Sequence, residues 1–540
     1  MTVTPATAST LSHCDVVVVG AGFAGLYQVH RLHQAGLAVR AFEKGADVGG
    51  TWYWNRYPGA RCDIESIVYS YSFDADLQRE WVWPQRYAEQ PDLLRYLQHV
   101  AERFDLRRHF SFETAVESAT YDEAARRWRI RTSTGEEIST QFFVMATGCL
   151  SVPLEPHFKG LDRYRGARYL TGRWPHAGVD FTGQRVGIIG TGSSSIQASP
   201  LIARQAEHLT VFQRTPQFAI PAWNRALTDE EMRHVQETYE DIRRLVRQSE
   251  VGVAYESPDH GAKEASPEAL RQQLEFAWAR GGYLMLAAYP DVVTDLASNR
   301  LVSDWVKEKI RARIEDPAIA RKLMPEYPMG AKRLCVDTDY YEIFNRDNVS
   351  LVDLRESAID GFTEQGLQLA NGEEYALDAV VFATGFDGMT GALTAVDIRG
   401  REGLSLRDKW RDGTKNYLGV TVSGFPNLFM ITGPGSPSVL YNMVASIEQN
   451  VDFVSDTIAY LRQHDIASIE ANAREERAWT KYVDWVSKQT IYTQVKSWYN
   501  GENVEGKPAG FMPYAGGGLT YFEFVRQAVA DGYRGYSLGR

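Results

Sequence analysis

The sequence has no long hydrophobic run. None of its apolar stretches approaches the ~20 residues that a membrane-spanning helix needs, so no membrane partner is expected. The start, Met1–His13, has no lysine or arginine and no apolar core. These features do not fit a secretion signal, and we interpret this segment as a disordered tail.

Cysteine is scarce and has no close pairing along the chain. The four cysteines are far apart, with no C-x-x-C pair: Cys14, Cys62, Cys149 and Cys335. This spacing argues against a structural zinc site, a disulfide framework and a redox-active cysteine pair. We therefore predict no metal and a cytoplasmic location.

Basic residues are in the minority. The 540 residues include 58 lysines and arginines against 69 aspartates and glutamates, which gives a net charge of −11. Binding to a nucleic-acid backbone requires a basic surplus, so we expect small-molecule partners, no nucleic acid, and a monomer or weak homodimer. The 44% hydrophobic content is typical of a soluble globular protein with several domains.

The 45 glycines are informative by their placement rather than their number. A predicted strand, Asp15–Val19, leads into Gly20-Ala21-Gly22-Phe23-Ala24-Gly25, then a helix, then a strand over Leu37–Phe42 that ends at Glu43. Glu43 lies 21 positions beyond Gly22, near the spacing at which an acid binds a ribose 2′-hydroxyl. This order predicts a βαβ unit that binds a dinucleotide with an unphosphorylated adenosine, such as FAD.

The same order recurs in a second unit. Strand Val186–Ile189 leads into Gly190-Thr191-Gly192-Ser193-Ser194-Ser195, and a strand over Leu209–Gln213 ends at Arg214 and Thr215. A guanidinium at that position can hold a 2′-phosphate, so we predict NADPH here. Glycines that only make tight turns, and a solvated surface arginine, are the alternatives.

The rest of the chain completes an α/β organisation. Thr228 and Glu231 form a capping-box pattern, Ser266-Pro267 opens another helix, Gly281 can close it, and a strand is predicted over Ala379–Phe382. We predict two Rossmann-like dinucleotide-binding domains with a helical insertion in the second. The predicted ranges are 1–150 and 389–540 for the FAD domain, with a mobile loop near the C-terminus, 151–223 and 331–388 for the NADPH domain, and 224–330 for the insertion.

The stretch from Gly49 to Asp63, GGTWYWNRYPGARCD, closely resembles the type I Baeyer–Villiger monooxygenases. The resemblance runs to the C-terminus, and two segments, Arg61–Ser66 and Gly433–Ser438, are more similar to phenylacetone and steroid monooxygenases than to the cyclohexanone type. Further matching segments are Ala146–Gly148, Gly190–Gln197, Phe212–Thr215, Lys332-Arg333, Ala383–Asp387 and Ser497–Tyr499.

One position departs from the family pattern. The fingerprint F-x-G-x-x-x-H-x-x-x-W-[PD] reads Tyr164, Gly166, Leu170, Trp174 and Pro175 here. The family histidine lies in the linker between the nucleotide domains and helps to coordinate their motion. Leu170 can neither donate nor accept a hydrogen bond, so this departure bears on domain coupling and on the use of NADPH.

The resemblance implies a flavin monooxygenase that uses NADPH and O2. Such an enzyme inserts one oxygen beside a ketone carbonyl through a C4a-peroxyflavin, giving an ester or lactone. It implies Arg333 as the fixed catalytic cation and Asp63 as the carboxylate that pairs with it. Rival hypotheses are an N- or S-oxygenating flavin monooxygenase, and a redox sensor that binds both cofactors without turnover. A bulky, aryl-substituted or polycyclic ketone is the expected substrate.

The expected site residues form two sets. The cofactor-binding residues are Gly20, Gly22, Phe23, Ala24, Gly25, Glu43, Gly50, Thr51, Trp52, Asp63, Tyr69, Val116, Met443, Thr191, Gly192, Ser193, Ser194, Ser195, Gln197, Arg214, Thr215, Lys332, Arg333 and Trp498. The substrate-pocket residues are Cys149, Leu150, Val439, Leu440 and Met443. Core packing is the alternative for the aromatic residues of the first set, and also for Met443.

Overall fold

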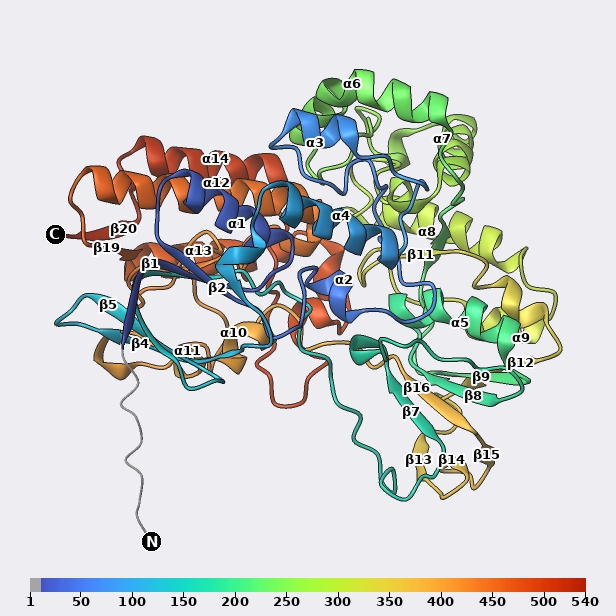
Figure 1. Ribbon diagram of the computed structural model, residues 1–540. Helices are drawn as coiled ribbons and strands as arrows, with labels where there is room; N and C mark the ends of the chain where they lie inside the picture. Colours follow the sequence, from blue (N-terminus) through green and yellow to red (C-terminus); the bar gives the residue numbers. More distant parts are fainter. Residues whose placement is uncertain (1–10) are drawn as a thin grey trace, which may run out of the picture.

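The computed structural model describes residues 11–540 as two large sheets, each accompanied by helices, with a helical region beside them (Figure 1). The predicted tail is wrong at its end, because Ser12 and His13 belong to the first strand and pair with Ile138 and Ser139. The strand predicted over Asp15–Val19 therefore begins three residues earlier, at Ser12. Residues 1–10 of that tail lie outside the described residues.

The first sheet has eight strands in the order β17-β4-β5-β6-β1-β2-β3, and β18 pairs with β6. Strand β1 lies between β2 and β6, parallel to both, whereas β4, β5 and β6 are antiparallel. The strands are β1 (Ser12–Val19), β2 (Val39–Phe42), β3 (Phe110–Ser111), β4 (Val116–Asp122), β5 (Arg127–Thr132), β6 (Glu137–Met145), β17 (Asp397–Arg399) and β18 (Leu428–Met430).

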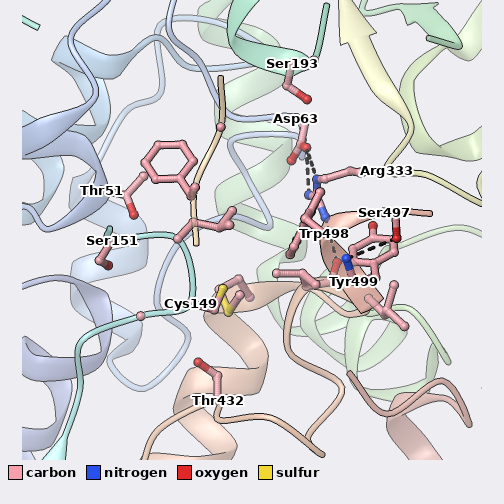
Figure 2. Close-up of a pocket in the computed structure, with 18 of the residues that line it drawn as sticks. Thr51, Asp63, Cys149, Ser151, Ser193, Arg333, Thr432, Ser497, Trp498 and Tyr499 are labelled. Carbon is pink, nitrogen blue, oxygen red and sulfur yellow. Dashed lines mark hydrogen bonds and ion pairs between the residues drawn. The ribbon is translucent and has the colours of Figure 1, made fainter. Parts of the chain in front are cut away.

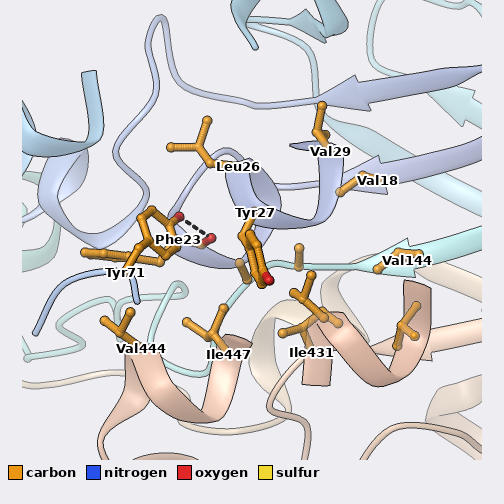
Figure 3. Packing of buried hydrophobic residues seen from close by; sticks show 14 of the residues in the cluster. Val18, Phe23, Leu26, Tyr27, Val29, Tyr71, Val144, Ile431, Val444 and Ile447 are labelled. Atoms are coloured by element: carbon orange, nitrogen blue, oxygen red, sulfur yellow. Dashed lines mark hydrogen bonds between the residues drawn. The ribbon is translucent and has the colours of Figure 1, made fainter. Parts of the chain in front are cut away.

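Helix α1 (Phe23–Gln34) packs between this sheet and α12 (Met443–Gln463), as Figure 3 shows. Leu26 and Val29 of α1, Val18 of β1, and Val444 and Ile447 of α12 are buried in one cluster. Each such side chain contributes about 1.5–3 kcal/mol through burial. This packing fixes the start of α1, where the first glycine loop ends.

The segments before β3 and after β16 also contain further helices and one strand pair. They are α2 (Thr51–Trp54), α3 (Ala75–Glu80), α4 (Gln90–Arg103), α10 (Gly391–Ala395), α11 (Leu406–Lys409), α13 (Ala473–Ser487), α14 (Gly518–Ala530), and the antiparallel pair β19 (Ser468–Ala471) and β20 (Tyr536–Gly539).

The second sheet has five parallel strands in the order β12-β9-β8-β16-β7. They are β7 (Ala167–Leu170), β8 (Arg185–Ile189), β9 (His208–Gln213), β12 (Val349–Asp353) and β16 (Ala379–Phe382), with α5 (Ser193–Gln205) after β8. The predicted strands 186–189, 209–213 and 379–382 are confirmed, whereas the strand predicted from Leu37 begins two residues later as β2. Two parallel βαβ units, β1-α1-β2 and β8-α5-β9, confirm the predicted α/β fold class.

The helical region follows β9. It contains α6 (Asp229–Gln248), α7 (Pro267–Arg280), α8 (Leu296–Arg311) and α9 (Pro317–Leu323), with the strand pair β10 (Ala219–Pro221) and β11 (Cys335–Asp337) at its base. The predicted capping box at Thr228 is confirmed, and Gly281 ends α7. A small antiparallel sheet follows: β13 (Ile359–Phe362), β14 (Gly366–Leu369) and β15 (Glu374–Ala376).

After β16 the chain returns to the first sheet, where β17 pairs with β4 and β18 with β6. The domain boundaries at 150, 223, 330 and 388 stay a prediction. No helix within residues 11–540 has both the length and the apolar composition that a membrane crossing needs.

Candidate active site

One continuous cavity of about 2610 Å³ joins the two glycine loops. Drug-sized ligands occupy pockets of roughly 300–1,000 Å³, so this cavity has room for more than one large ligand. Its wall includes the end of β1, the end of β8, the insertion near Tyr283 and the C-terminal segment around Trp498. Both predicted nucleotide sites therefore open into the same space.

The first glycine loop forms a cradle without side chains. A Cβ on Gly20, whose φ is +109°, would lie 2.5 Å from the Ala146 carbonyl oxygen, and one on Gly22 would lie 3.3 Å from the Gly50 Cα. The loop ends at the N-terminus of α1, where backbone N–H groups and the helix dipole favour a phosphate. These features fit the pyrophosphate of a dinucleotide.

Glu43 closes this cradle at the end of β2. Its carboxylate accepts hydrogen bonds from Ala21 N at 2.9 Å and Gly45 N at 2.8 Å, and the residue is buried. Each carboxylate oxygen has a second lone pair. The carboxylate can therefore still accept a hydrogen bond from a ribose hydroxyl, as its spacing along the sequence from the glycine loop predicts.

The second glycine loop repeats the construction of the first. A Cβ on Gly190, with φ of +108°, would lie 2.5 Å from the Ala383 carbonyl oxygen, whereas a Cβ on Gly192 would meet open space. Both carbonyls come from an Ala-Thr-Gly segment that follows a parallel strand, at 146–148 and at 383–385. Thr191 Oγ1 donates to the Thr215 carbonyl at 2.7 Å, which ties this loop to the end of β9.

Cationic side chains gather beside the second loop. Arg214 is exposed directly after β9, and Lys332 lines the same cavity. Burial, and next the charge of Arg214, lower the pKa of Lys332 from its usual value. The two cations are therefore close enough to repel, and a phosphate between them would relieve that repulsion.

Arg333 and Asp63 form an ion pair in the cavity wall (Figure 2). Arg333 Nε and Nη2 donate to Asp63 Oδ2 at 2.9 and 2.8 Å, and Nη1 donates to the Val439 carbonyl at 2.8 Å. The two side chains are only 23% and 18% exposed, so water screens the pair weakly. Trp498 and Tyr499 lie beside the guanidinium in Figure 2.

The electrostatics keep Arg333 charged. Burial lowers the pKa of its guanidinium, but the negative charge of Asp63 and the hydrogen bonds to it offset this effect and raise the pKa well above its usual value. The cavity therefore holds a fixed positive charge that can stabilise an oxyanion without any proton movement.

An apolar cluster faces this charge. Cys149, Met389 and Met512 are buried together, and Leu150, Val439, Met443 and Trp498 pack against them. Burial raises the pKa of the Cys149 thiol, which suits an apolar wall better than a nucleophile. The cluster brings together four of the five predicted substrate-pocket residues, all but Leu440, and adds Met389 and Met512, for which the sequence offered no signal.

Almost all predicted site residues line the cavity. These include Gly20, Gly22, Phe23, Ala24, Glu43, Gly50, Thr51, Trp52, Asp63, Tyr69, Val116, Cys149, Leu150, Thr191, Gly192, Ser193, Ser194, Gln197, Arg214, Thr215, Lys332, Arg333, Val439, Leu440, Met443 and Trp498. Tyr283 and Tyr499 also line it and were not among the expected site residues. Tyr499 lies in the matching segment Ser497–Tyr499, which could have indicated it, whereas no local pattern distinguishes Tyr283 from other tyrosines.

Gly25 and Ser195, the third positions of the two loops, do not line the cavity. A Cβ on Gly25 would lie 1.7 Å from the Gly20 carbonyl oxygen, and Ser195 is fully buried. Both sit where the helix crosses its own loop. Their small size allows close helix–strand packing, and direct contact of either residue with a cofactor stays a prediction.

Leu170 ends β7 opposite Phe382 and packs with Phe158 against the core of the second sheet. Apolar packing thus takes the place of the hydrogen-bonding side chain expected there. Within residues 11–540, no three or more His, Cys, Asp or Glu side chains are grouped to hold a metal ion.

Comparison with known proteins agrees with this geometry. The family model "Flavin-binding monooxygenase-like" matches residues 13–226. A Baeyer–Villiger monooxygenase of Pseudooceanicola batsensis is 41% identical, over 96% of this chain and 95% of its own length. The phenazine N-monooxygenase PhzNO1 of Lysobacter antibioticus is 39% identical, over 98% of this chain and 97% of its own.

Among solved structures, an oxidised steroid monooxygenase bound to NADP superposes with a TM-score of 0.94 at 48% identity, over 98% of this chain and 100% of that chain. Near-complete coverage at this identity extends over both glycine loops, the Arg333–Asp63 pair and the apolar cluster. The chain belongs to the Baeyer–Villiger monooxygenases, within the flavin-binding monooxygenase-like proteins.

Proposed function

We propose that this protein is a monooxygenase that uses FAD, NADPH and O2 to insert one oxygen atom beside a ketone carbonyl, giving an ester or lactone. When bound, the two dinucleotides supply the hydride and activate the oxygen. The observation that carries the proposal is the Arg333–Asp63 pair, which lies in the single cavity that joins the two glycine loops.

The proposed roles follow from position. Asp63 orients Arg333, and Arg333 stabilises the negative charge that develops on the carbonyl oxygen of the ketone. Leu150, Val439 and Met443 line the cavity and pack against the buried cluster, and they exclude water from the reacting carbonyl. Water in this space would divert activated oxygen to hydrogen peroxide.

The cofactor roles are proposed in the same way. Glu43 holds the ribose of FAD, and Arg214 and Lys332 hold the 2′-phosphate of NADPH, with Trp498 closing over it. The first sheet, with residues 1–150 and 389–540, takes FAD, and residues 151–223 and 331–388 take NADPH. We also propose a monomer or weak homodimer, and a cytoplasmic location suited to four unpaired thiols.

A bulky ketone is the proposed substrate class. The cavity volume is compatible with it, since about 2610 Å³ is more than twice the roughly 1,000 Å³ of the largest pockets that hold drug-sized ligands. The 48% identity to a steroid monooxygenase supports it as well.

N-oxygenation is the second candidate, and the 39% identity to a phenazine N-monooxygenase favours it. The two candidates differ in what the cavity must do. A ketone needs a cation beside its carbonyl oxygen, whereas a nitrogen nucleophile does not. The fixed charge of Arg333 therefore favours ketone oxygenation.

A product screen tests the proposal. Cyclic, aryl and steroid ketones, sulfides and N-heteroaromatic amines are each incubated with the FAD-loaded protein, NADPH and O2, and product and NADPH loss are measured together. We expect ester or lactone formation matched to NADPH loss. Amine oxidation faster than that of every ketone would favour the second candidate. Normal FAD binding with conversion of no ketone would refute the proposal.

A further inference from the structure

The helical insertion reaches the Arg333–Asp63 pair through one side chain, Tyr283. Tyr283 lies in a short 3-10 turn, Gly282–Met285, directly after α7. Its position is tightly set: a Cβ on Gly281 would lie 2.2 Å from the Pro221 carbonyl oxygen, and one on Gly282 would lie 2.2 Å from Tyr87 Oη. The turn is therefore wedged between β10 and Tyr87, and Tyr283 has little freedom to move.

Tyr283 touches both members of the pair. Its Oη lies 3.3 Å from Asp63 Oδ2 and 3.0 Å from the Leu334 carbonyl oxygen, so one proton is shared between two acceptors. The guanidinium carbon of Arg333 lies 5.4 Å from the centre of the Tyr283 ring, within the range of a cation–π contact. One side chain thus contacts the carboxylate with its tip and the guanidinium with its face.

Burial raises the pKa of Tyr283 well above its usual value. The hydroxyl therefore remains a hydrogen-bond donor at every working pH. Asp63 Oδ2 accepts from Arg333 through two nitrogens and from Tyr283 through one oxygen, and these donors fix the carboxylate from two different segments of the chain.

We propose that Tyr283 is a positioning residue for the reaction: it holds the Asp63 carboxylate and the Arg333 guanidinium in the orientation that oxygenation needs. This inference rests on the proposed function and deepens it. It gives the insertion a part in the chemistry, because the insertion supplies the third side of the Arg333 site. Without Tyr283 the Arg333 guanidinium stays charged, but fewer contacts fix its orientation.

The test distinguishes the contribution of the Tyr283 hydroxyl from that of its ring. Tyr283→Phe removes only the hydroxyl, and Tyr283→Leu removes the ring as well. Tyr255→Phe is the matched control, because Tyr255 belongs to the same insertion and also donates to a carboxylate, Glu65 Oε1, at 3.1 Å. For each protein, kcat and KM for a converted ketone, the hydrogen peroxide released per NADPH, FAD content and Tm are measured.

For Tyr283→Phe we expect kcat to fall about tenfold, the scale of one hydrogen bond to a charged group. The peroxide share should rise, while KM for NADPH, FAD content and Tm stay close to wild type. Tyr283→Leu should lose more activity, and Tyr255→Phe should match wild type.

The inference is overturned if Tyr283→Phe keeps the kcat and coupling of wild type. It is equally overturned if both tyrosine-to-phenylalanine variants lose activity together, or if the loss follows Tm and FAD content. If Tyr283→Leu does not fold, Tyr283→Phe alone decides. A wild-type protein that converts no ketone marks a different failure, that of the proposed function, and the inference then falls with it.

Discussion

Arg333 is held on several sides before any ligand binds. Asp63 accepts from two of its nitrogens, the Val439 carbonyl accepts from the third, and the Tyr283 ring covers one face. A guanidinium held in this way needs little reorganisation when negative charge appears nearby, and preorganised charge is worth most in a site that excludes water.

The first prediction concerns this charge. Arg333→Ala should lower ketone oxygenation by about 100-fold or more, the scale seen when one oxyanion-stabilising donor is lost. FAD binding should survive, because the FAD cradle is made by Gly20, Gly22 and Glu43. Steady-state product formation and bound FAD are the measurements. Arg280→Ala is the control, because Arg280 pairs with Glu65 at 3.3 Å rather than with Asp63. Ester formation at the wild-type rate in Arg333→Ala would contradict the role.

The second prediction concerns Arg214. Arg214→Ala should raise KM for NADPH by about 10-fold or more while KM for NADH stays nearly constant, because only NADPH carries the 2′-phosphate. Initial rates with both cofactors measure the effect. Lys332→Ala should also raise KM for NADPH relative to KM for NADH. An equal loss for NADPH and NADH would remove the phosphate assignment.

Sequence reasoning succeeded where chemistry follows local spacing. Gly20 and Glu43 occupy fixed positions along the first βαβ unit, and Gly190 occupies the matching position in the second, so spacing alone was enough to place them. Arg333 and Asp63 lie 270 positions apart and were found only through a resemblance. Tyr283 could not be found, because its role depends on a turn docking against another part of the chain.

At the scale of elements, the two βαβ units were predictable and their surroundings were not. The apolar spacing of α6 shows which face is buried, but not that Met232, Val235 and Tyr239 pack with the core of the first sheet. Leu170 shows the same limit. The family fingerprint places a histidine here, so the sequence indicates only a lost hydrogen bond. In the structure this position faces Phe382 in the neighbouring strand, and an apolar side chain is favoured there.

The C-terminal segment closes against the second unit. Lys507 Nζ donates to Asp387 Oδ1 at 2.5 Å and to the Gly388 carbonyl at 2.7 Å, and Asn503 Nδ2 donates to the Phe386 carbonyl at 2.8 Å. Trp498 packs on the same stretch, since a Cβ on Gly388 would lie 2.9 Å from its ring. These contacts fasten Trp498 beside Arg333.

The third prediction follows from this fastening. Lys507→Met should raise KM for NADPH by about 5- to 10-fold, because the lost buried ion pair loosens the segment that holds Trp498. Limited proteolysis should cut faster within 501–510, with little change in Tm. Lys488→Met is the control, since its partner Asp484 lies on the exposed face of α13. Unchanged KM and unchanged cleavage in Lys507→Met would show that the ion pair does not fasten the segment.

At the scale of the whole molecule, the net charge does not show where individual charges lie. The chain carries a net charge of −11, yet Arg214, Lys332 and Arg333 all line one cavity. Acidic side chains, among them Glu43 and Asp63, line the same cavity, so each cation acts locally on the anionic group beside it, and the acidic surplus of the chain disfavours nucleic acid. Composition alone could indicate that nucleic-acid binding is disfavoured, but only the fold shows that the three cations line one cavity.

One buried cation, Arg243 of α6, joins the helical insertion to the segment before and within α3. Its Nε donates to Gln78 Oε1 at 2.9 Å and its Nη2 to Ser70 Oγ at 2.8 Å and the Tyr71 carbonyl at 3.2 Å, all in the segment before and within α3. The residue is 4% exposed and stacks on Tyr239. The insertion is therefore fixed to the first sheet's side of the cavity.

The last prediction tests this attachment. Arg243→Met keeps much of the apolar stem but leaves buried acceptors at 68–78 without a donor, a loss that should lower Tm by about 3–6 °C. Amide hydrogen exchange over 68–78 and over α6 should accelerate together, because each segment loses its contact with the other. Arg244→Met is the matched control, since the neighbouring Arg244 is 55% exposed and pairs only with Asp241 of its own helix. If both variants melt alike, or if exchange accelerates in α6 alone, Arg243 is not the link between the insertion and the first sheet, and the apolar contacts of Met232, Val235 and Tyr239 must carry that attachment.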